Sequence, residues 1–144
     1  MIQFACVGLD HRHIYDMTEG LLAAGAECVG YFTRDDAEPL GGFIRRFPKV
    51  PRFESPEILY QRKDVSLIVC AGIPGERAEI CIQAMRHGKD VMVDKPGIIT
   101  KQQLRKVIQV RQDTGARYSI SFSEHFQVPA VLKAKELIEQ GAIG

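Results

Sequence analysis

Short apolar runs alternate along this chain with segments whose apolar residues recur every three or four positions. The runs have the length and composition of β-strands and lie at residues 2–8, 27–32, 65–71, 90–93 and 117–123. The third run is continuously apolar, which is typical of a central parallel strand with both faces covered. The alternation predicts a doubly wound α/β fold, with a parallel sheet of about six strands and helices on both faces.

The intervening segments carry helix start and stop signals. Helices are expected between Ile14 and Gly25, at 55–62, between Ala78 and Gly88, between Thr100 and Gly115, and from Pro129 to Gly141. Ser55 followed by Pro56 has the residue types of an N-cap and first helical position. Thr100 and Gln103 have the spacing of a capping box. The stretch 33–53 contains Pro39, Gly41 and Gly42, which interrupt any long helix.

Composition narrows the class of protein. The chain has 144 residues, 45% of them hydrophobic and 26% charged, with a formal net charge of +1. This balance predicts one globular domain and argues against nucleic acid as a partner. No apolar run reaches membrane-spanning length and the N-terminus does not resemble a signal peptide, so we expect a cytoplasmic protein without a membrane partner. Widely separated cysteines predict buried free thiols; they are Cys6, Cys28, Cys70 and Cys81.

In such folds ligands bind in loops at the carboxyl ends of the strands, and the first loop is ambiguous. A dinucleotide-binding turn has the pattern G-x-G-x-x-G, of which this chain keeps only Gly8. Asp10 stands at the second glycine position and His13 at the third. One interpretation is a phosphate loop to which His11 and Arg12 supply positive charge. The other is that the Asp10 carboxylate caps the helix and takes the amides a phosphate would need.

The second loop bears on the choice of cofactor. An acidic residue after the second strand binds the 2′-hydroxyl of NAD, whereas an arginine accommodates the 2′-phosphate of NADP. Thr33 and Arg34 occupy this point, which favours NADP over NAD. The alternative is that Arg34 points into solvent and Asp35 binds the ribose.

The loop 94–97 holds the strongest candidate for chemistry. Lys95 followed by Pro96, at the end of a buried strand, places an amine in the crevice on a rigid turn. The alternative is a solvated surface lysine. His87, just before a helix-ending glycine, is interpreted as structural. No histidine, cysteine or acidic residues have the spacing of metal ligands, so no metal is expected. No tyrosine precedes a lysine by four positions, which disfavours a short-chain dehydrogenase.

Two longer segments resemble a known family. "ILYQRKDVSLIVCAGIPGERAEICIQAMRHGKDVMVDKPGIITKQQL" is similar to the central block of the Gfo/Idh/MocA oxidoreductases, with its T-P-x-x-x-H, A-G-K-H-V and E-K-P elements. "SFSEHFQVPAVLKAKELIEQGAIG" is similar to that family's G-x-x-x-R-F element and the K-x-x-I-x-x-G-x-I-G helix that follows. The resemblance implies that residues 1–144 form a single NAD(P)-binding Rossmann domain, and that the family's C-terminal substrate domain is absent from this chain.

The resemblance also implies roles for individual residues. Lys95 matches the E-K-P lysine, which lies near the nicotinamide and helps to move the proton of the reacting hydroxyl. Asp94 replaces the glutamate before it, Arg77 replaces the usual histidine, and His125 stands for the R-F arginine. The implied cofactor-binding residues are Gly8, Asp10, His11, Arg12, His13, Thr33, Arg34, Ala71, Gly72, Ile73, Pro74, Asp94, Lys95, Pro96 and His125.

Two hypotheses follow. The first is the cofactor domain of an NAD(P)-dependent dehydrogenase that acts on a sugar, cyclitol or related polyol, with Lys95 as the catalytic residue and little turnover by this chain alone. The second is a non-catalytic nucleotide-binding or regulatory module with a degenerate phosphate loop. Apolar surface on the last helix is expected to drive self-association, so a homo-oligomer is expected.

Overall fold

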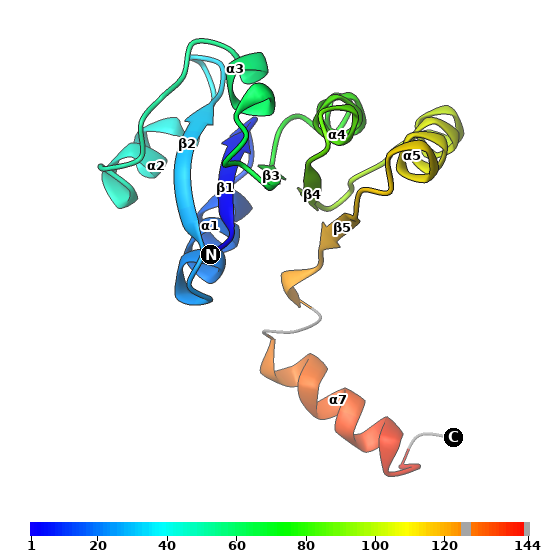
Figure 1. The fold of residues 1–144 in the computed structure, drawn as a ribbon. Coiled ribbons are helices and arrows are strands. Elements are labelled where there is room, and N and C mark those ends of the chain that lie inside the picture. The colour runs from blue at the N-terminus through cyan, green and yellow to red at the C-terminus, as the bar shows by residue number, and fades with distance from the viewer. Residues whose placement is uncertain (125–127, 143–144) are drawn as a thin grey trace.

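The protein is built on one parallel β-sheet. In the computed structural model, which describes residues 1–124 and 128–142, five strands lie in the order β2-β1-β3-β4-β5 (Figure 1). The strands are β1 (Gln3–Val7), β2 (Glu27–Phe32), β3 (Leu67–Cys70), β4 (Asp90–Asp94) and β5 (Tyr118–Ser121). An isolated parallel bridge between Tyr31 and Arg52 extends the sheet beyond β2. The predicted doubly wound Rossmann fold is confirmed, with five strands and one bridge where about six strands were expected.

Helices cover both faces of the sheet. They are α1 (His13–Ala23), α2 (Leu40–Arg46), α3 (Pro56–Gln61), α4 (Arg77–Arg86), α5 (Lys101–Thr114) and α7 (Pro129–Glu139). Helices α1 and α2 pack on one face and α3, α4 and α5 on the other. Figure 1 shows α7 set apart from the sheet, and none of its residues is buried.

The two cores follow from the alternation of side chains along each strand. On β1, Ala5 and Val7 contribute to the core beneath α3, α4 and α5, whereas Phe4 and Cys6 contribute to the core beneath α1 and α2. The central strand β3 shows the same division, as its apolar run predicts. All four cysteines are free and buried, as predicted.

Local signals placed most helix boundaries correctly. The Thr100 side chain accepts a hydrogen bond from the Gln103 backbone N–H, and the Gln103 side-chain oxygen accepts one from the Thr100 N–H, which confirms the capping box. Ser55 occupies the N-cap of α3, but its side chain makes no capping bond. The irregular stretch 33–53 contains only the short helix α2. No helix in the described ranges is long and apolar enough to cross a membrane.

Candidate functional site

The carboxyl ends of β1 and β3 meet closely because of glycines in the loops that follow them. Gly8 has a φ of +77°, a left-handed conformation that glycine adopts at little cost. A β-carbon at Gly8 would lie 2.9 Å from the Gly72 Cα, so any larger residue would force the two loops apart. The Gly8 carbonyl accepts a hydrogen bond from the Ala71 N–H. The strand order reverses between β1 and β3, which is where such folds bind ligands. The loops that follow these two strands therefore lie close together at the ligand-binding edge.

The N-cap residue of α1 makes no side-chain capping bond, and the His13 N–H lies 3.5 Å from Nδ1 of His11. Arg12 occupies the N-cap position with helical dihedral angles, and its guanidinium pairs with Glu38. The interpretation of Asp10 as the capping residue is wrong, because the Asp10 carboxylate accepts a 2.6 Å hydrogen bond from Arg34. A strong cationic partner on the neighbouring loop competes better for this carboxylate than the helix amides.

The second loop is held by ion pairs. Arg34 bridges to the first loop through Asp10, so the alternative in which it points freely into solvent is wrong, and this contact raises the pKa of its guanidinium. Asp35 pairs with Arg52 at 2.6 Å. The Thr33 hydroxyl accepts a hydrogen bond from the Leu9 N–H. These loops line a cavity of about 240 Å³ at the edge of the sheet.

The predicted catalytic lysine has an acidic partner that the sequence did not reveal. The Lys95 ammonium lies 2.9 Å from a carboxylate oxygen of Glu124, just beyond β5. Hydrogen bonding from Lys95 lowers the pKa of Glu124 to about 2. Both side chains are partly exposed, so the pair faces outward from the edge. Lys95 is therefore neither deeply buried nor freely solvated.

The turn that carries Lys95 is supported from below. The Lys95–Pro96 peptide is cis. The Tyr118 hydroxyl donates a hydrogen bond to the Gly97 carbonyl, and burial raises the pKa of this tyrosine well above its ordinary value. A β-carbon at Gly97 would lie 2.7 Å from a Val93 methyl, so the turn needs glycine here.

Beneath this turn lies a buried ion pair. Arg77, on α4, donates from Nη2 to a carboxylate oxygen of Asp94 at 3.0 Å. Its Nη1 donates to the carbonyls of Asp94, Lys95 and Pro96, and its Nε donates to the carbonyl of Gly72. Both side chains are at most 2% exposed. Arg77 thus joins the loop after β3 to the loop after β4.

Two histidines of the first loop converge on the same carboxylate. Nδ1 of His11 lies 2.9 Å from Oδ2 of Asp94, and Nδ1 of His13 lies 2.8 Å from Oδ1. The two rings meet edge to face with centroids 4.3 Å apart. The spacing of residues along the sequence does not predict this cluster of two histidines and one aspartate, because Asp94 is 81 positions from His13.

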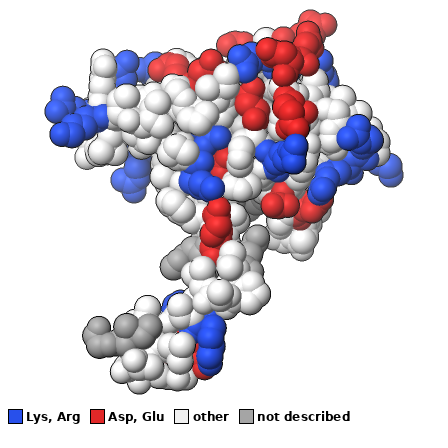
Figure 2. All heavy atoms as spheres, turned by 180° about the vertical axis from the view of Figure 1, so that it is seen from behind, with Lys and Arg blue, Asp and Glu red and all other residues white. Residues whose placement is uncertain are grey.

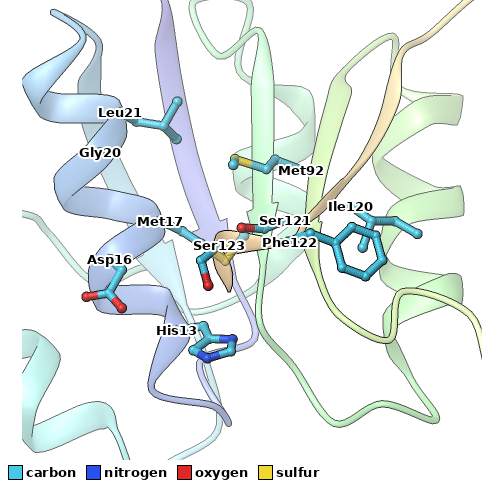
Figure 3. Close-up of a pocket in the computed structure, with 10 residues that line it drawn as sticks. All are labelled: His13, Asp16, Met17, Gly20, Leu21, Met92, Ile120, Ser121, Phe122 and Ser123. Atoms are coloured by element: carbon cyan, nitrogen blue, oxygen red, sulfur yellow. The ribbon is translucent and has the colours of Figure 1, made fainter. Parts of the chain in front are cut away.

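A second cavity opens beside His13. It measures about 310 Å³ and lies between α1 and the ends of β4 and β5. Figure 3 shows His13 and Met17 of α1 on one side and Ser121, Phe122 and Ser123 on the other. Its lining is mostly apolar and includes Met17, Leu21, Met92, Ile120 and Phe122. The cavity suits a largely apolar group.

The back face of the molecule does not carry charges of one sign only (Figure 2). Figure 2 shows basic and acidic side chains intermixed over the face seen from behind. This distribution agrees with the near-zero net charge.

The structure brings most of the predicted site residues to one edge. The loops after β1, β3 and β4 meet through the contacts of Gly8, Gly72 and Asp94, and Arg34 joins them through Asp10. Arg12 turns away toward Glu38. His125 lies outside the described residues. Sequence reasoning missed Glu124 as the Lys95 partner. His87 contacts the Gln83 carbonyl within α4 and stacks on Tyr60, in line with a structural role.

Comparisons with known proteins agree with this arrangement. Residues 23–122 match the family model described as the oxidoreductase family with an NAD-binding Rossmann fold. A proposed oxidoreductase from Erwinia carotovora atroseptica is 40% identical, with a TM-score of 0.93 over 100% of this chain and 43% of the other. A proposed NADPH-dependent oxidoreductase from Desulfitobacterium hafniense is 24% identical, with a TM-score of 0.82 over 99% of this chain and 41% of the other.

A more distant structure shares the fold alone. A proposed myo-inositol dehydrogenase from Sinorhizobium meliloti is 20% identical, with a TM-score of 0.78 over 100% of this chain and 43% of the other. A search of curated proteins gave no match. The chain spans about two fifths of the length of the solved structures named above.

The parallel sheet, its strand order and the ligand-binding edge define a dinucleotide-binding domain of the Rossmann class. The family model and the 40% identity over the whole chain make the assignment specific. This chain belongs to the Gfo/Idh/MocA oxidoreductase family. It corresponds to the NAD(P)-binding Rossmann domain of that family.

Proposed function

We propose that this chain binds NAD(P) across the edge formed by the loops after β1, β2, β3 and β4, and serves hydride transfer between the nicotinamide and a carbon bearing a hydroxyl group on a sugar, cyclitol or related polyol. The observation that carries the proposal is the position of Lys95 at the end of β4, with its amine facing outward beside Glu124. A proton-transfer group at this point lies where ligands bind in doubly wound folds.

Lys95 would hydrogen-bond the reacting hydroxyl and help to move its proton. The bound nicotinamide would supply the hydride acceptor or donor. Glu124 would hold the ammonium in place until a substrate oxygen replaces one of its contacts. Arg77 fixes the backbone of the Lys95 turn through its bonds to three successive carbonyls, which limits how far the amine can move.

The residues present fit a dinucleotide with a modified phosphate cradle. Gly8 preserves the tight turn, and neither Asp10 nor the N-cap residue Arg12 caps α1 with its side chain, which supports a phosphate at this helix N-terminus. Asp10 and His13 add side chains where the pattern has glycines. Arg34 lies at the adenosine end and favours NADP, as a partner for the 2′-phosphate.

A second candidate is a nucleotide-binding or regulatory module without chemistry. The observation that favours it is the state of the first loop, in which the Asp10 and His13 side chains fill glycine positions and both are held by other residues. The substrate class rests on family resemblance, and the substrate shell would come from a further domain. The domain is proposed to self-associate as a homo-oligomer.

The first test is a titration of the chain with NADH and NADPH, following nicotinamide fluorescence, which no tryptophan in this chain obscures. We expect saturable binding with NADPH tighter than NADH. Arg34→Ala should remove that preference, and the matched variant Arg86→Ala should not. Tighter NADH binding would move the ribose contact to Asp35, and binding of neither nucleotide would contradict the proposal.

A second test addresses Lys95. In a longer form of the protein that includes a substrate domain, with NADP⁺ and a panel of polyols, Lys95→Ala should lower turnover by about 10²-fold or more, the range for loss of a proton-transfer group. Lys101→Ala, which removes an exposed lysine at the start of α5, is the control. Unchanged turnover in Lys95→Ala, with nucleotide binding intact, would overturn the role proposed for Lys95.

A further inference from the structure

We propose that His11, His13 and Asp94 form a binding site for one transition-metal cation of the zinc class, between the first loop and the Lys95 turn. Two imidazole nitrogens and one carboxylate come from loops far apart in the sequence. Their ligand atoms all lie within 4.8 Å of one another. Neutral imidazole and carboxylate are the ligands that zinc, cobalt and iron cations bind in proteins.

The distances suit coordination with a small adjustment. Nδ1 of His11 and Nδ1 of His13 lie 2.9 Å and 2.8 Å from the two Asp94 oxygens. Metal–nitrogen and metal–oxygen bonds of about 2.0–2.2 Å place neighbouring ligand atoms roughly 3 Å apart. Each histidine nitrogen therefore lies near the separation from the carboxylate that a shared cation requires, and the two nitrogens lie within 4.8 Å of each other.

The electrostatics of the contacts call for a positive charge between the rings and the carboxylate. A bare ring nitrogen and a carboxylate oxygen repel each other at these distances, so a proton or a cation must lie between them. The His13 backbone N–H also lies 3.5 Å from Nδ1 of His11. A ring nitrogen that has given up its proton beside a carboxylate is the form that binds a metal ion.

Arg77 acts as an outer partner of this group. It donates to Oδ2 of Asp94, as residues behind a metal-binding carboxylate commonly do. Its other donors bond the carbonyls of Gly72, Lys95 and Pro96. Arg77 contacts Oδ2 and Oδ1 lies beside His13, so the Asp94 carboxylate is held in place with one oxygen directed at the first loop.

The site is open on one side. Asp94 is fully buried, whereas the side chain of His11 is 48% exposed and that of His13 is 25% exposed. Three protein ligands at an open edge leave a further position for water or for an oxygen of a bound molecule, which is the arrangement of reactive rather than structural zinc sites. The open side faces the edge on which the cofactor is proposed to bind.

The test uses the chain after treatment with a chelator, without nucleotide, titrated with Co²⁺ and followed by its visible absorption. We expect one equivalent to bind saturably, without the sulfur charge-transfer bands that cysteine ligands would give. Zn²⁺ should displace it. His11→Ala and His13→Ala should each weaken binding by at least about 100-fold, with the fold retained by circular dichroism.

His87→Ala is the matched control, since it removes the remaining histidine of the described part of the chain and should leave Co²⁺ binding unchanged. Absence of saturable binding would overturn the site and leave protons between the rings and Asp94. Binding that survives both histidine variants would also overturn it. Because no nucleotide is present, the result is independent of whether the chain binds NAD(P).

Discussion

Arg77 and Asp94 form an ion pair that is closed to solvent, with Nη2 3.0 Å from Oδ2 and both side chains at most 2% exposed. The pair links α4 to the end of β4, and every remaining donor contact of the guanidinium goes to a loop carbonyl. Charges in such a place are tolerated because each has its partner. The site edge therefore depends on one helix residue.

Replacing that residue should destabilise the fold. Arg77→Leu leaves the Asp94 carboxylate and several carbonyls buried without a donor, and we expect a loss of about 3–5 kcal/mol in the free energy of unfolding. Urea denaturation measures this loss. Arg86→Leu, an exposed arginine on the same helix, should change stability by less than about 0.5 kcal/mol. Equal effects of the two variants would contradict the role given to the pair.

Gly8 and Gly25 allow backbone strain to be separated from close packing. Both have left-handed φ values, of +77° and +83°, but only Gly8 has neighbours within reach of an added β-carbon. Alanine at either position should cost about 1–2 kcal/mol for the backbone conformation. Gly8→Ala should cost more and should weaken nucleotide binding, because the loop after β3 must move. If both variants lost the same free energy of unfolding and the same nucleotide affinity, the role given to close packing at Gly8 would be wrong.

The Lys95–Glu124 pair should make stability depend on acid pH. The pKa of Glu124 is lowered in the folded protein to about 2, so the pair contributes fully above the ordinary value near 4.5 and loses its effect as the pH falls toward 2. The stability difference between the native chain and Glu124→Gln should therefore shrink over that interval. A carboxyl NMR titration that places Glu124 at its ordinary value would contradict the pairing.

Breaking the Asp10–Arg34 pair should sharpen cofactor preference. Asp10→Asn frees the Arg34 guanidinium and removes a negative charge from the first loop. We expect NADPH binding to tighten up to about five-fold relative to NADH, because the freed guanidinium can pair with the 2′-phosphate and exposed ion pairs are weak. Asp36→Asn, whose carboxylate lies farther from Arg34 at 3.7 Å, is the control. Loss of NADPH preference would argue for Asp10 as a direct ligand.

The sequence by itself determined the class of fold and the location of the binding edge. Apolar runs such as 65–71 and helix signals such as Thr100 with Gln103 depend on neighbours within one or two turns, so they can be read locally. Lys95 at the end of a strand was predictable for the same reason. The family motifs indicated the Gfo/Idh/MocA oxidoreductases, whose family model matches residues 23–122.

Tertiary structure alone decided which charged groups meet. Asp10 matches an N-cap by residue type, yet it pairs with Arg34, because packing of β2 beside β1 brings a guanidinium closer than the helix amides. His11, His13 and Asp94 meet because parallel strands end at one edge, although the sequence separates them by about eighty positions. Contacts between residues far apart in the sequence depend on how the sheet and helices pack. The periodicity of apolar residues along the chain therefore does not predict them.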